Sequence, residues 1–145
     1  MKILILNGPN INMLGIREPH IYGSQSYFDL ENLVKDYAKE KGIELKLFQS
    51  NHEGALVDEI QNAYFQKFDG IVFNPAAYTH TSIALLDALK ETKIPCVEVH
   101  ISEPDSREEF RHISYIRSAC IGTVTGKGLK GYTEAMELLI NYLSK

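Results

Sequence analysis

The sequence predicts an α/β fold built on a five-stranded parallel sheet, and two observations support this. Short apolar runs recur along the 145-residue chain, at residues 2–6, 43–48, 70–74, 95–99 and 119–124. Most of them are rich in Ile, Val and Leu, which is typical of strands buried on both faces. Helical patterns lie between several of these runs, and strands that alternate with helices form parallel sheets covered on both faces.

The helical patterns are of unequal length. The first carries apolar residues at the spacing of one helical face, namely Leu30, Leu33, Val34, Tyr37 and Ala38, and Gly42 stands where a C-terminal cap belongs. The second has a face formed by Leu56, Ile60, Ala63 and Tyr64. Residues 81–91 predict a third helix, capped by Thr79 or Thr81. Residues 106–113 predict a short fourth helix, and residues 132–143 a long terminal one.

Five strands in a chain of this length fit a flavodoxin-like, three-layer order. The sequence contains no linker, internal repeat or low-complexity segment, so residues 1–145 are expected to form a single catalytic domain. In open parallel sheets of this kind, ligands bind outside the carboxyl ends of the strands. The segments predicted at that edge are polar: 7–10, 50–53, 74–80 and 100–102. This clustering predicts a site there.

Composition excludes several classes of partner. Fifteen basic against nineteen acidic residues give a net charge of −4, which argues against binding to nucleic acid. No apolar run approaches the length of a membrane span, and the first one is too short for a signal peptide. Cys96 and Cys120 both lie in strand-like runs, so we expect buried, reduced thiols, as suits a cytoplasmic protein.

The segment CVEVHIS places Glu98 and His100 two residues apart, hence on the same side of a strand. The neighbouring strand ends in NPAAYTHTS, which offers Asn74 and His80 to the same region. Three such groups could ligate zinc, as in a zinc hydrolase, or they could form a catalytic acid with its orienting partners. Metal is the weaker option, because no H-E-x-x-H motif occurs.

Two further motifs carry alternatives. GKGLKG (126–131) matches a dinucleotide-binding fingerprint, and would suit a nucleotide-binding module. However, only 14 residues follow Gly131, with no further strand, so a glycine-rich turn before the last helix is favoured. In SREEFR, Arg107 and Arg111 have i, i+4 spacing, with Glu108 and Glu109 turned elsewhere. They suit either a surface helix with ion pairs or a lid that binds an anionic or polyhydroxylated substrate.

The loop GIREPHIYG brings Arg17 and Tyr22 together. A phenol titrates near 10 in water, so a tyrosine that acts as a base at neutral pH needs about 4 kcal/mol of preferential stabilisation of its phenolate. One or two guanidinium groups shielded from water supply that order of magnitude. Tyrosine as base, arginine as activator and histidine as acid would make a proton-transfer or elimination site without a metal.

Four motifs together resemble the type II 3-dehydroquinate dehydratases: NGPNINMLGIREPHIYG, SNHEG, NPAAYTHTS and EVHISEPDSREEFR. The resemblance runs from residue 2 to about residue 140. It implies a flavodoxin-like fold, a dodecamer built from trimers, and the cofactor-free dehydration of 3-dehydroquinate to 3-dehydroshikimate. That reaction belongs to the shikimate route to aromatic amino acids or to quinate catabolism.

The resemblance also implies roles for single residues. Tyr22 would be the base and Arg17 its activator, Asn10 would stabilise the enolate through a held water, and His100 would be the acid, oriented by Glu98 and Asn74. The backbone N–H groups of Ile101 and Ser102 would bind the substrate carboxylate. His80 and Arg111 would hold ring hydroxyls, Arg107 would close with the lid, and Asp87 would reach into a neighbouring subunit's site.

Overall fold

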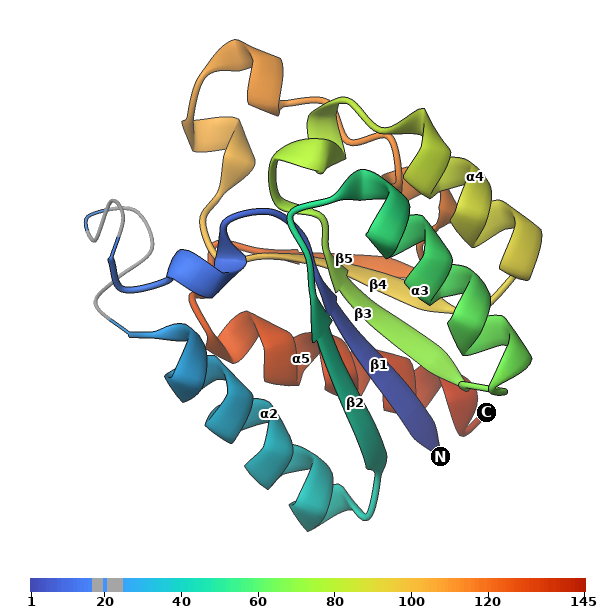
Figure 1. Cartoon of the computed structure of the whole chain (residues 1–145). Coiled ribbons are helices and arrows are strands. Elements are labelled where there is room, and N and C mark those ends of the chain that lie inside the picture. The colour runs from blue at the N-terminus through green and yellow to red at the C-terminus, as the bar shows by residue number, and fades with distance from the viewer. Residues whose placement is uncertain (17–19, 21–24) are drawn as a thin grey trace.

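The core of the protein is a parallel sheet, seen here in a computed structural model that describes residues 1–16, 20 and 25–145 (Figure 1). The strands of the described residues are β1 (Lys2–Asn7), β2 (Glu44–Gln49), β3 (Gly70–Asn74), β4 (Cys96–His100) and β5 (Gly122–Thr125). They lie in the order β2-β1-β3-β4-β5, and every pairing is parallel. The predicted flavodoxin-like arrangement is therefore confirmed.

The pairing register aligns the carboxyl ends of the strands. Asn7 at the end of β1 pairs with Asn74 at the end of β3 and with Gln49 at the end of β2. On the other side, His100 at the end of β4 pairs with Thr125 at the end of β5. Polar residues far apart in the sequence thus meet along one edge, as expected for an open parallel sheet.

Helices cover both faces of the sheet. On one face pack α2 (Tyr27–Lys41) and α5 (Lys130–Leu143), and on the other α3 (Glu53–Phe65) and α4 (Ile83–Thr92) (Figure 1). Alternate strand residues serve the two cores: Ile5 and Val97 belong to the first, whereas Leu6 and Cys96 belong to the second. This alternation follows from the two-residue period of a strand.

The helix ends follow local sequence, with one correction. Ser26 and Asp29 form a capping box at the start of α2, and Gly42 closes that helix in the left-handed conformation, with φ 69°. At α4 the predicted cap was wrong: Ser82, not Thr79 or Thr81, accepts a hydrogen bond from the Leu85 N–H. Ser82 is the residue with extended backbone before the first turn, which is what an N-cap requires.

The connection between β4 and β5 contains no α-helix, so the helix predicted over 106–113 was wrong. It consists of three single 3-10 turns, η3 (Pro104–Ser106), η4 (Glu109–Arg111) and η5 (Arg117–Ala119). Arg107, directly after the first of them, has extended backbone, with φ −108° and ψ −161°. Phe110 and Ile113 are 63% and 56% exposed, so this segment buries no apolar stripe that would stabilise a helix.

Smaller differences concern side chains at element ends. Tyr64 is exposed at the end of α3, whereas Glu59 lies in the buried face with Leu56, Ile60 and Ala63. Cys120 lies in the turn before β5 rather than within the strand, and is only half-buried. Cys96 is buried in β4 as predicted, and both cysteines are free thiols. Among the described helices, none combines the length and the apolar character that crossing a membrane requires.

Candidate active site

A pocket of about 190 Å³ opens at the carboxyl edge of the sheet, between the segments that follow β1, β3 and β4. Most of the residues predicted for a site lie in its lining: Asn10, Asn74, His80, His100, Ile101, Ser102, Arg107 and Arg111. Glu98 lies behind His100, fully buried. The pocket thus collects residues from three separate segments, those that follow β1, β3 and β4.

Three predicted residues are not part of this lining. Asp87 is exposed on α4. Arg17 and Tyr22 lie outside the described residues. In the sequence, Arg17 and Tyr22 lie between Ile16 and Gln25, which are both described.

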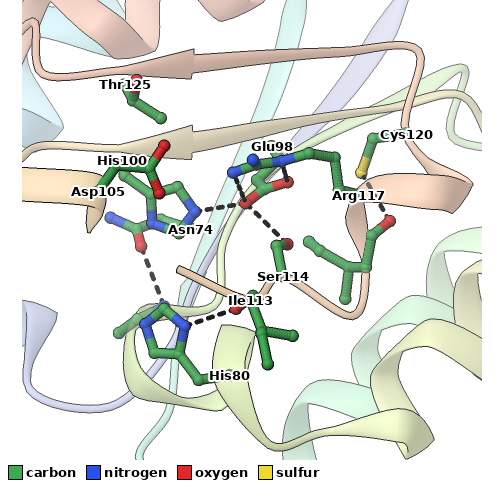
Figure 2. Close-up of polar contacts among 12 residues, drawn as sticks. Asn74, His80, Glu98, His100, Asp105, Ile113, Ser114, Arg117, Cys120 and Thr125 are labelled. Atoms are coloured by element: carbon green, nitrogen blue, oxygen red, sulfur yellow. Dashed lines mark hydrogen bonds and ion pairs between the residues drawn. The ribbon is translucent and has the colours of Figure 1, made fainter. Parts of the chain in front are cut away.

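His100 and Glu98 form a buried hydrogen-bonded pair on β4 (Figure 2). His100 Nε2 lies 2.5 Å from Glu98 Oε2, as their spacing on one side of the strand predicts. Because Glu98 is ionised, Nε2 carries the proton and donates it to this hydrogen bond. The other ring nitrogen, Nδ1, is then the one that can exchange a proton with a ligand in the pocket.

Glu98 has two further partners that the sequence did not reveal. Arg117 donates from Nε to Oε1 and from an Nη to Oε2, each over 3.1 Å, and Ser114 Oγ donates to Oε2 over 3.0 Å. Burial opposes ionisation of the carboxyl, but the hydrogen bonds and charges of His100 and Arg117 outweigh it and lower the pKa of Glu98 to about 2.

Asn74 is fixed by a buried network that reaches across the sheet. Its Nδ2 donates to the Tyr132 hydroxyl over 2.9 Å, and that hydroxyl donates to Asn7 Oδ1 over 2.5 Å. Its Oδ1 accepts from the N–H of Ala76 over 3.0 Å, and Ala76 itself adopts the left-handed conformation with φ 55°. The Asn74 amide is therefore engaged with Tyr132 and Ala76 rather than with the His100 ring.

His80 is held in one tautomer by the segment that covers the site. The Ile113 carbonyl accepts a hydrogen bond from His80 Nδ1 over 2.7 Å, so Nδ1 carries the proton and Nε2 is an acceptor. Burial is the main cause that lowers the pKa of His80 from 6.5. The ring is thus neutral at physiological pH, and it can accept a hydrogen bond from a ligand hydroxyl.

An ion pair between two side chains lies on the exposed segment at the outer side of the pocket. Arg111 Nε lies 3.2 Å from the Glu108 carboxylate, three residues earlier, so Glu108 is its partner and is not turned elsewhere as predicted. Asn10, another lining residue, adopts the left-handed conformation with φ 70°, and its N–H donates to Asn51 Oδ1. That bond ties the SNHEG motif to the end of β1.

The glycine-rich loop supports the end of β4. The N–H of Gly126 donates to the carbonyls of His100 and Ser102, and that of Gly128 donates to the Ile101 carbonyl. Both glycines have φ above 60°, which other residues rarely adopt, so the loop needs them to turn beneath the strand end. The GKGLKG motif is thus explained by backbone geometry. In the described part of the chain, β5 is the last strand of the sheet, so the second half of a dinucleotide-binding unit has no counterpart there.

The zinc alternative meets an obstacle at Glu98. Both of its oxygens accept hydrogen bonds from protein donors, Arg117 among them, so they are not available to a cation. Within residues 1–16, 20 and 25–145, no group of three or more His, Cys, Asp or Glu side chains is arranged to hold a metal ion. The pocket instead combines a buried proton donor, a neutral imidazole and two arginines.

A sequence model of the family "Dehydroquinase class II" matches residues 1–140. The chain belongs to this family. A 3-dehydroquinate dehydratase of Clostridium perfringens is 52% identical over 143 residues, covering 99% of this chain and 98% of the relative. One from Caldicellulosiruptor bescii is 53% identical over 138 residues, with 95% of each chain covered.

Solved structures of class II dehydroquinases agree with this fold. A type II dehydroquinase from Butyrivibrio crossotus superposes with a TM-score of 0.95 at 55% identity, over 97% of both chains. One from Propionibacterium acnes superposes with a TM-score of 0.90 at 40% identity, over 99% of this chain and 97% of the other. The family that the four sequence motifs indicated is therefore confirmed.

Proposed function

We propose that this class II dehydroquinase removes water from 3-dehydroquinate to give 3-dehydroshikimate, a hydro-lyase reaction of the shikimate pathway. The observation that carries this function is the near full-length identity of about half to relatives named 3-dehydroquinate dehydratase. The pocket supports it, because a buried His–Glu pair and the polar groups that line the same pocket suit acid-assisted elimination.

The reaction begins with removal of a proton from the carbon next to the ketone. Tyr22 takes this proton as a phenolate, and Arg17 in the same loop favours the phenolate electrostatically. The electron pair left on carbon delocalises onto the ketone oxygen as an enolate. Asn10, which lines the same pocket as His100, stabilises that oxygen through a hydrogen-bonded water.

His100 completes the elimination by protonating the leaving hydroxyl. As the enolate collapses, the bond to the tertiary hydroxyl breaks, and the proton on His100 Nδ1 converts that group into water. The trans course of the elimination requires the base and the acid to act from opposite sides of the ring. Glu98 keeps Nε2 protonated throughout, so the imidazolium that donates from Nδ1 returns to a single neutral tautomer.

The remaining lining residues orient the substrate. The backbone N–H groups of Ile101 and Ser102 bind its carboxylate, where the Gly126–Gly128 loop fixes the chain after β4. His80 accepts from a ring hydroxyl at Nε2, and Arg111 donates to another. Asn74 lies in the wall beside them, and Arg107 closes over the bound substrate with the segment that carries it.

The catalytic unit is residues 1–145, acting without a cofactor or metal in a dodecamer built from trimers in the cytoplasm. The family match over residues 1–140 supports the extent of the unit, and the two free thiols suit a reducing compartment. Asp87 is exposed on α4, where it is accessible to the site of a neighbouring subunit. The mass of the assembly in solution tests this: a monomer that retains full activity would contradict it.

The decisive experiment follows ultraviolet absorbance as the conjugated enone of the product forms from 3-dehydroquinate, using chelator-treated protein. We expect turnover by the parent chain and loss of nearly all of it in Tyr22→Phe, with an unchanged melting temperature. Tyr142→Phe, at an exposed position on α5, is the matched control and stays active. A flat trace from folded parent protein would refute the function, and an active Tyr22→Phe would refute the base.

A further inference from the structure

Arg117 shields the Glu98 carboxylate from solvent, and it has no role in the catalytic steps proposed for Tyr22 and His100. Its guanidinium makes a two-point contact with both carboxylate oxygens, each over 3.1 Å. The Glu98 side chain is fully buried, whereas 44% of the Arg117 side chain is exposed. Figure 2 shows the Arg117 guanidinium and the His100 ring both reaching the same carboxylate. Arg117 thus lies at the exposed end of a hydrogen-bonded series that runs through the buried Glu98 carboxylate to His100.

The fold holds Arg117 in this position from both sides. Ile116, directly before it, is fully buried in the core beneath α3 and α4. The N–H of Tyr115 donates to the Thr79 carbonyl over 3.0 Å, and that of Ile121 donates to the Cys96 carbonyl over 2.8 Å. The turn that carries Arg117 is therefore fixed between η2 (Ala76–His80) and β4, the two elements that carry His80 and His100.

The charges in contact balance only while Arg117 is present. Glu98 Oε2 accepts from His100, Ser114 and Arg117, and among these donors Arg117 alone carries a permanent charge. Without it, the buried carboxylate would draw a proton onto the His100–Glu98 pair, because the imidazolium would be its remaining cationic partner. Among the described residues, the other titratable or charged groups near this cluster include Cys96, His80, Asp105 and Cys120, and Arg107 and Arg111 line the same pocket as His100. None of these makes a two-point contact with Glu98.

We propose that Arg117 is a positioning residue for the acid step. Its positive charge balances the negative charge of the Glu98 carboxylate, and this balance sets how readily His100 releases its proton. An acid that donates in each turnover must also give up that proton near the working pH, and an unbalanced carboxylate next to His100 would hold it too tightly. The two-point contact also fixes the carboxylate plane, and with it the direction of the His100 ring. This inference rests on the proposed function of His100 as the acid.

The test compares Arg117→Met and Arg117→Gln, which remove the charge, with Arg117→Lys, which keeps it. In the free protein, nitrogen NMR follows titration of the His100 imidazole, identified by the signal missing in His100→Asn. We expect the midpoint to move up by about one to two pH units in Met and Gln, the size of effect of one adjacent charge. Lys should stay within about half a unit of the parent. Lys35→Met, exposed on α2 on the opposite face, controls for net charge.

A second readout is the pH dependence of kcat with 3-dehydroquinate. The alkaline limb should move to higher pH in the neutral variants and stay in place in Arg117→Lys. If Arg117 were only structural, all three variants would lose melting temperature and none would move the titration midpoint, which overturns the proposal. The NMR titration needs no turnover, so it stays decisive even if the protein proves inactive on 3-dehydroquinate. Failure of the proposed function is thereby distinguished from failure of this inference. If Met does not fold, Gln, which retains side-chain donors, provides the same titration test.

Discussion

The two walls of the pocket are built in opposite ways. The inner wall, formed by Asn74 and His100 at the ends of β3 and β4 with Glu98 behind His100, is buried, and its side chains are held by hydrogen bonds. The rim segment, residues 103–113, consists of 3-10 turns with exposed apolar side chains and a surface ion pair. From this difference we expect the acid step to depend on the fixed geometry at the sheet edge, and the rim segment to contribute to substrate binding.

A substitution of His100 tests this division most directly. His100→Asn should lower kcat by about 10² to 10⁴-fold, the usual worth of a positioned general acid, while the melting temperature changes little. The enone assay and a thermal melt measure the two quantities. His112→Asn, an exposed histidine of the rim segment, is the matched control and should stay near parent activity. Equal losses in both variants would mean that the two walls are not distinct.

The buried carboxylate predicts a specific acid sensitivity. The pKa of Glu98 is depressed from 4.5 to about 2 in the folded state, so its contribution is present above pH 4.5 and is lost as pH falls toward 2. The shift corresponds to about 3 kcal/mol of unfolding free energy. Urea unfolding of the parent and of Glu98→Gln should therefore differ by about that amount at pH 7 and converge near pH 2. A difference that does not depend on pH would contradict the ionised pair.

The network behind the inner wall should show a smaller effect, on stability more than on turnover. Tyr132→Phe removes the hydroxyl between Asn74 and Asn7 and leaves two buried amide groups without that partner. We expect a loss of about 1–3 kcal/mol in unfolding free energy, measured by urea denaturation. Tyr142→Phe, on the exposed side of the same helix, should cost under about 0.5 kcal/mol. A neutral Tyr132→Phe would show that the network does not hold the wall.

A substitution in the rim segment should affect substrate binding alone, and its effect should be the smallest of the four. Arg111→Lys keeps the charge but loses the planar fork, so we expect KM for 3-dehydroquinate to rise about tenfold with kcat within about twofold. Stability should not change measurably, because the pair with Glu108 is exposed and screened by solvent. Steady-state kinetics and a melt test this, with Glu108→Gln as the control. A fall in kcat without a change in KM would place Arg111 in the chemical step.

The same contrast explains what could be predicted from the sequence. The strands, their parallel order and the facing of Glu98 and His100 follow from local patterns with fixed periods, so they were predicted correctly. The helix over 106–113 was wrong because its spacing was helical while its apolar side chains had no surface to pack on. Local spacing alone does not reveal that absence of packing.

Partners that arrive from distant segments were not predictable in this way. Arg117 and Ser114 reach Glu98 from irregular turns 19 and 16 residues further on, where no period relates the positions. Tyr132 bonds to Asn7 across 125 residues, and it appeared in the sequence only as one more apolar position of a terminal helix. A buried carboxylate was the available signal, because Glu98 inside an apolar strand requires a cationic partner from somewhere in the chain.

The most direct test of the proposed division separates the two proton transfers. In D₂O, His100→Asn should still exchange the hydrogen on the carbon next to the ketone of 3-dehydroquinate, since the base and the enolate-stabilising groups are intact, while enone formation is nearly abolished. Proton NMR of the substrate pool follows the exchange, and ultraviolet absorbance follows the product. Exchange without product would establish that the inner wall serves the departure of the hydroxyl. A folded variant that neither exchanges nor dehydrates would contradict it, because His100 would then be needed to remove the first proton.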